Sequence, residues 1–157
     1  MQRRAALTRE ALQIARRLGN PTTLAYVLES AFAGISPDDT EDWLAIGNEL
    51  VRVAREAGDR EREFFGHQHG LGALMVMGDI RAADGRLEAM AQLTDELHQP
   101  TQQRALAVTR TMRALFAGRL AEAEQLIQEA LELGPGGHGF DPVWFWVVQV
   151  QAWALAR

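Results

Sequence analysis

The stretch GRLAEAEQLIQEALELGP, residues 118–135, decides the fold class of this chain. Gly118 and the pair Gly134–Pro135 bound a helix, because glycine accepts a left-handed helix end and proline cannot continue the hydrogen-bond ladder. Between them, apolar residues recur every three or four positions, the spacing of one helix face. They are Ala123, Leu126, Ile127, Ala130, Leu131 and Leu133. The stretch therefore predicts one amphipathic helix.

A second apolar stripe, from Val108 to Phe116, precedes Gly118 and has the same helical spacing. Two helices joined by so short a turn lie antiparallel and bury their stripes against each other. The region therefore predicts a helical hairpin.

Residues that end helices recur along the whole chain at a nearly constant interval. One class is Gly19, Gly58, His98 and Gly134, spaced 39, 40 and 36 residues apart, and the other is Gly34, Gly78 and Gly118, spaced 44 and 40 apart. A period near 40 residues with two helices in each period indicates a helical solenoid. We expect an all-α fold, an alpha-alpha superhelix of about eight antiparallel helices. The whole chain, residues 1–157, then forms one domain of four hairpins, at about 2–34, 36–78, 80–118 and 119–157.

The hairpin around Gly118 resembles the second half of a tetratricopeptide repeat, with Ala123 and Ala130 seven residues apart and Pro135 at its close. The joints ARRLGNP, AREAGDRE and TDELHQPTQ resemble the helical-repeat regions of large bacterial signalling ATPases and transcriptional regulators, of the LuxR-type or cyclase-linked kind. The resemblance implies a tetratricopeptide-like (TPR-like) solenoid that binds a protein, peptide or effector on its concave face.

Composition narrows the class of protein. The 157 residues are 47% hydrophobic and 24% charged, as in an ordinary soluble globular domain. The net charge of −5 argues against binding nucleic acid or an anionic membrane. The first residues lack the apolar core of a signal peptide, and no apolar run reaches the ~18 residues of a membrane span. We expect a cytoplasmic protein.

Residues for catalysis are scarce. The chain has no cysteine, and its sixteen basic residues are all arginines. This excludes thiol and lysine chemistry, including a phosphate-loop lysine. His67 and His69 are two residues apart, whereas a metal pair on a helix is spaced by three or four. We expect no enzyme activity, no cofactor and no metal.

Candidate binding residues are taken from the helices that precede the turn glycines Gly34, Gly78 and Gly118, because one helix of each pair lines the concave face of a solenoid. Tyr26 and Arg110 lie eight residues before Gly34 and Gly118, and Glu29 and Arg113 lie five before. The alternative for each is an ordinary solvated surface. The candidate set is Tyr26, Glu29, His67, Arg104, Arg110 and Arg113.

Both ends of the chain carry apolar helix patterns. In residues 2–18, one face collects Leu7, Ala11, Ile14 and Leu18. In VWFWVVQVQAWALA, residues 143–156, only two glutamines are polar, which is typical of a buried helix. Either a further repeat or a second copy of the chain is expected to cover this segment. The residues expected at that contact are Trp144, Trp146, Val147, Val150 and Trp153.

These patterns predict a non-catalytic repeat module that binds a protein or ligand. It would be the sensor or scaffold part of a bacterial signalling or transcriptional regulator. The alternative is a free-standing homodimeric adaptor that uses the segment at residues 143–156.

Overall fold

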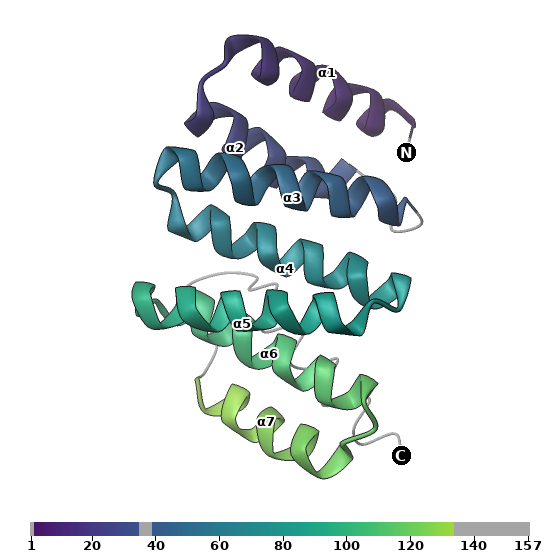
Figure 1. The fold of residues 1–157 in the computed structure, drawn as a ribbon, viewed down its shortest axis with the longest axis vertical. Helices are drawn as coiled ribbons and strands as arrows, with labels where there is room; N and C mark the ends of the chain where they lie inside the picture. Colours follow the sequence, from purple (N-terminus) through teal and green to yellow (C-terminus); the bar gives the residue numbers. More distant parts are fainter. Residues whose placement is uncertain (1, 35–38, 134–157) are drawn as a thin grey trace. The chain divides into compact units, whose positions relative to one another are not determined.

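The computed structural model describes residues 2–34 and 39–133, and this part of the chain is helical (Figure 1). It contains one short 3₁₀ helix, η1 (Phe32–Gly34), and no strand. The α-helices are α1 (Gln2–Leu18), α2 (Pro21–Ala31), α3 (Thr40–Ala57), α4 (Arg60–Met77), α5 (Ile80–Leu97), α6 (Pro100–Phe116) and α7 (Leu120–Glu132). The all-α prediction is confirmed, with seven α-helices in the described residues. The expected eighth helix, which includes residues 143–156, lies outside them.

The chain divides into two compact units, Met1–Leu93 and Thr94–Arg157. In the first unit, α2 packs on α1 and α3, and α3 packs on α4 (Figure 1). In the second unit, α6 packs on α7. The expectation of a single domain over 1–157 stays a prediction.

Left-handed residues end most of the helices at the predicted places. The backbone angle φ is +65° at Gly19, +70° at Gly58, +81° at Gly78 and +70° at Gly118. His98 is the one described residue other than glycine with a positive φ, at 53°. Gly34 differs, because it closes η1 without a positive φ. It is a close-contact glycine, since a Cβ there would overlap the hydroxyl of Thr8 on α1.

The core of unit 1 forms where α1, α2 and α3 meet, and Leu28 and Leu50 at its centre are completely buried. The buried face of α1 carries Leu12 and Ala15. The apolar stripe predicted from the sequence of this helix lies elsewhere and is exposed to solvent. Its large members are Leu7, 57% exposed, Ile14, 44% exposed, and Leu18, 65% exposed. Helix α1 is therefore apolar on two faces.

Helices α3 and α4 approach each other backbone to backbone. A Cβ added at Gly47 of α3 would lie 3.1 Å from the nitrogen of Gly70 and 3.2 Å from the oxygen of Gly66, both on α4. A Cβ at Gly66 would lie 3.0 Å from the nitrogen of Val51. A side chain at Gly47 or Gly66 would therefore require the facing helix to shift. We call the set Gly47, Gly66 and Gly70 the glycine seam.

Candidate functional site

Two polar side chains lie buried one helical turn apart on α4. Glu63 is 3% exposed and His67 is 5% exposed. Residues four apart on a helix lie on the same face, so the two side chains share one environment. Asp59 caps this helix, its side chain accepting a hydrogen bond from the Arg62 backbone N–H at 3.0 Å. Glu63 is in the first turn, where the helix dipole favours a carboxylate.

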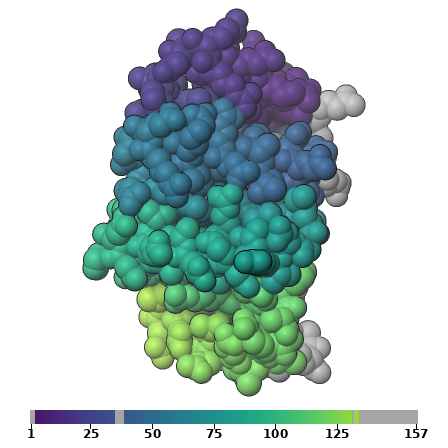
Figure 2. Space-filling model, in the orientation of Figure 1, coloured from purple at the N-terminus to yellow at the C-terminus, as the bar shows by residue number. Residues whose placement is uncertain are grey.

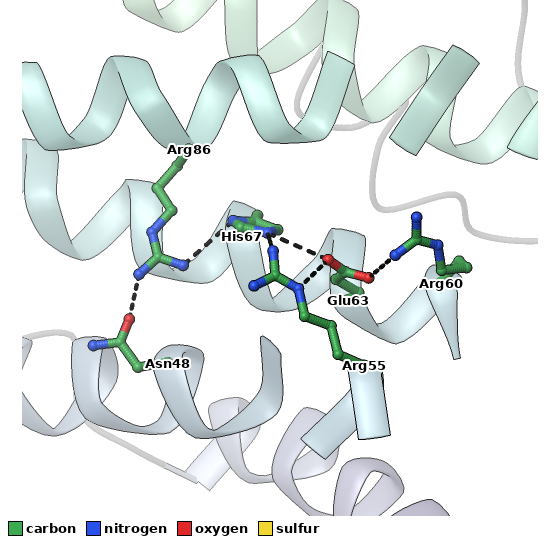
Figure 3. Close-up of polar contacts among 6 residues, drawn as sticks. All are labelled: Asn48, Arg55, Arg60, Glu63, His67 and Arg86. Carbon is green, nitrogen blue, oxygen red and sulfur yellow. Dashed lines mark hydrogen bonds and ion pairs between the residues drawn. The ribbon is translucent and has the colours of Figure 1, made fainter. Parts of the chain in front are cut away.

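Two arginines neutralise the buried carboxylate of Glu63. The Nε of Arg55, on α3, donates to Oε1 at 2.6 Å, and Nη1 of Arg60 donates to Oε2 at 2.7 Å (Figure 3). A buried carboxylate costs several kcal/mol unless it is paired in this way. Because both oxygens are engaged, Glu63 serves as an anchor that holds Arg55 in place.

His67 lies between two guanidinium groups. Its Nδ1 is 3.3 Å from Nη1 of Arg86, and its Nε2 is 3.4 Å from Nη2 of Arg55 and 3.9 Å from Oε1 of Glu63 (Figure 3). A neutral imidazole has one acceptor nitrogen and one N–H, so His67 accepts a hydrogen bond from only one of these two guanidinium groups at a time. Burial lowers the pKa of His67 to about 4, helped by repulsion from Arg86 and Arg55 and opposed by Glu63.

Arg86 reaches this cluster from α5. Its Nη2 donates to the side-chain oxygen of Asn48 on α3, and its guanidinium carbon is 3.6 Å from the position that a Cβ on Gly70 would take. The side chain is half-buried, and burial followed by repulsion from Arg55 lowers its pKa. Within the described part of the chain, no carboxylate forms an ion pair with Arg86. Arg86 is thus a partly desolvated cation held by two neutral side chains.

An open cleft of about 450 Å³ lies over this cluster, between α3, α4 and α5. Its lining residues are Asn48, Val51, Arg52, Arg55, Glu56, His67 and Arg86. The lining contains three arginines and one glutamate, Glu56. Arg52 forms an ion pair with Glu56 at 2.8 Å on the exposed rim. The cleft is therefore cationic in a chain whose net charge is −5.

The structure places the predicted binding residues in several locations. Tyr26 and Glu29 of α2 lie together beside Arg62 of α4, whose guanidinium carbon is 5.3 Å from the Tyr26 ring centre and whose Nε is 3.0 Å from Oε2 of Glu29. The pKa of Arg62 is raised, chiefly by its hydrogen bond to Asp59. Of the predicted set, His67 lines the cleft.

The other predicted residues lie outside unit 1. On α6, Arg104 is buried at 7% exposure, Arg110 is exposed and Arg113 is intermediate. The predicted contact residues Trp144, Trp146, Val147, Val150 and Trp153 lie outside the described residues.

Sequence reasoning missed Asn48, Arg55, Glu63 and Arg86. The four-residue spacing of Glu63 and His67 was an available signal, because it predicts a carboxylate and an imidazole on one helix face. No local pattern marks Arg86, which is 19 residues further along the chain and belongs to another helix.

The described residues hold neither a cluster of metal ligands nor a membrane-spanning helix. Among the described side chains, no three histidine, cysteine, aspartate or glutamate residues converge as metal ligands would. None of the described helices combines the length and hydropathy needed to cross a bilayer. Comparison of the chain with protein-family models, curated proteins and solved structures found no match.

Proposed function

We propose that this chain is a non-catalytic binding module, a TPR-like array of helical hairpins, and that it holds an acidic peptide segment of a protein partner in the α3–α4–α5 cleft. The module would act as the sensor or scaffold part of a bacterial signalling or transcriptional regulator, in the cytoplasm. The observation that carries the proposal is Arg86, a half-buried cation without a carboxylate partner in the described residues, at the wall of an arginine-lined cleft.

The chemistry of the cleft favours a carboxylate as the bound group. A guanidinium binds carboxylates through paired N–H donors, and Arg86 has donors beyond the two directed at Asn48 and His67. Val51 is the one apolar residue of the lining, and Glu56 reduces the attraction for a multiply charged ion. This mixture suits an acidic side chain in a peptide better than an isolated phosphate.

Binding is a better account of the cluster than acid–base catalysis. A catalytic base needs a proton-accepting atom within hydrogen-bond reach of substrate. Both carboxylate oxygens of Glu63 are engaged by arginines, and both ring nitrogens of His67 face protein groups. These two residues support the arginines that face the cleft.

The test is fluorescence anisotropy with a labelled glutamate-rich peptide and a matched glutamine-rich peptide. We expect only the glutamate-rich peptide to bind, and to bind more weakly as salt rises. Arg86→Gln is expected to weaken binding by about tenfold or more, the loss of one charge-assisted hydrogen-bonding group. Arg81→Gln is the matched control, because Arg81 is an exposed arginine on the same helix outside the cleft lining.

Equal binding of both peptides, or equal losses in the two arginine variants, would contradict the proposal. Displacement of the peptide by inorganic phosphate at a similar concentration would reassign the cleft to small anions.

A further inference from the structure

Helix α1 presents a continuous apolar stripe to solvent, apart from the face that packs into unit 1. The stripe consists of Leu7, Ala11, Ile14 and Leu18, all exposed. Single exposed apolar residues are common, but a contiguous row of large ones marks an interaction surface. Helix α1 lies at one edge of unit 1 (Figures 1 and 2). The exposure of the four residues shows that the described helices leave this stripe uncovered.

The spacing of the stripe is that of a helix–helix seam. Successive members are separated by four, three and four residues, the alternation of the two core positions in a heptad repeat. A stripe of this kind covers a partner helix that runs nearly parallel or antiparallel to it. The surface is therefore shaped for another α-helix.

Charged residues beside the stripe indicate which helix would pair with α1 and in which direction that helix would run. Glu10 and Arg17 are exposed, are seven residues apart on the same flank, and form no ion pair with any described residue. In an antiparallel pair of two α1 helices, Leu7 faces the partner's Leu18 and Ala11 faces the partner's Ile14. The same register sets Glu10 against the partner's Arg17, and two-fold symmetry repeats that ion pair.

A parallel pair lacks these matches. It would place Ala11 against the partner's Ala11, leaving a gap, and Glu10 beside the partner's Ala15, which is buried in its own unit. Size and charge complementarity both favour the antiparallel register.

We propose that α1 is a self-association surface, through which two copies of the chain pair antiparallel about a two-fold axis. This inference does not depend on the cleft. The contact is small, so association is expected to be reversible and to depend on concentration.

The test is sedimentation velocity over a wide concentration range with charge-reversal variants of the full chain. Glu10→Arg and Arg17→Glu each set like charges opposite one another twice, and each is expected to raise the dimer dissociation constant about tenfold. The double variant E10R/R17E exchanges the charges and is expected to restore wild-type affinity. Both positions are exposed and both residue types favour helix, so circular dichroism should show unchanged folding.

Arg9→Glu is the matched control, because Arg9 is exposed on the side of α1 away from the stripe and its reversal should leave association unchanged. Ile14→Asp should give a monomer. A wild-type chain that stays monomeric at every concentration would overturn the proposal. So would a dimer that Ile14→Asp leaves intact, which would place the contact elsewhere, or a double variant as weak as the singles.

Discussion

Two histidines of α4 are held neutral in the folded protein. His67 is buried between Arg55 and Arg86, which lowers its pKa to about 4. Burial alone lowers the pKa of His69 to about 4. The His69 ring stacks on Phe32, with ring centres 3.6 Å apart and planes inclined by 13°, and it adjoins Trp43. Both side chains serve the fold as neutral rings.

The first prediction is that stability falls in mild acid. The unfolded chain takes up a proton on each histidine near pH 6.5, whereas the folded chain does so only near pH 4. Stability is therefore full above pH 6.5, declines as the pH falls from 6.5 to 4, and levels off below 4 for these two groups. At pH 5 each histidine is expected to cost about 2 kcal/mol relative to pH 8. Urea denaturation at a series of pH values measures the decline.

The variant His69→Phe removes the contribution of His69 to this pH dependence and leaves that of His67. Phenylalanine keeps an aromatic ring against Phe32 and Trp43 but takes up no proton. The variant should match the wild-type free energy of unfolding near pH 8 to within about 1 kcal/mol and exceed it by about 2 kcal/mol at pH 5. An unchanged pH dependence would show that His69 is not neutral in the folded state.

At the scale of the helix pair, the glycine seam joins α3 to α4. Val51 Cγ2 lies 2.8 Å from the position that a Cβ on Gly66 would take, and the Val51 nitrogen lies 3.0 Å from it. A methyl group at this position has to move backbone as well as a side chain. By contrast, a Cβ on Gly85 of α5 would meet nothing within 4 Å.

These two glycines give opposite predictions for the same substitution. Gly85→Ala should raise the free energy of unfolding by about 0.5–1 kcal/mol, the gain in helix propensity. Gly66→Ala has the same gain but overpacks the seam at a cost of about 1–3 kcal/mol, so a net loss of about 1 kcal/mol is expected. Thermal and urea unfolding of the two variants measures the difference. If Gly66→Ala were as stable as Gly85→Ala, the helices would be further apart than described.

The sequence predicted where helices end better than which faces they bury. Gly58 and Gly78 end their helices in the left-handed conformation as expected, because this requirement is local to the turn. The face of α1 was harder to predict, because its sequence carries two apolar stripes with the same period. The face with Leu12 and Ala15 is the one that packs on α2 and is buried. The spacing of apolar residues along α1 does not indicate which of the two stripes is buried.

At the scale of the molecule, the helix ends repeat. Gly19, Gly58 and His98 are 39 and 40 residues apart, and Gly78 and Gly118 are 40 apart, all with positive φ. A repeating array makes contacts mainly between neighbours, so the stability of each helix depends on how many neighbours it has. In unit 1, α3 packs on both α2 and α4, whereas α1 packs on α2 and η1.

Backbone hydrogen exchange should be slower in helices that pack against more neighbours. Backbone amides of α3 and α4 are expected to exchange most slowly in unit 1, and those of α1 faster, at low protein concentration. Mass spectrometry of peptic fragments resolves the three helices. Faster exchange in α3 than in α1 would contradict the packing order.

The cleft could not be predicted from the sequence because it depends on how three helices are rotated about their axes. Helical periodicity gives the faces of α3, α4 and α5 separately, but Asn48, His67 and Arg86 meet only once the glycine seam and the turn at Gly78 fix those rotations. The net charge of the whole chain is negative, so it gives no indication of the local cluster of arginines.

The glycine seam also affects how the cleft would respond when a ligand binds. Asn48 and Arg55 stand on α3 and His67 on α4, two helices in close backbone contact, so these residues line the same side of the cleft. Arg86 stands on α5, beyond the short turn at Gly78 and Asp79. A ligand that binds both Arg55 and Arg86 would therefore link α5 to the α3–α4 pair, and any movement caused by binding is expected at α5, because α5 is not part of the glycine seam.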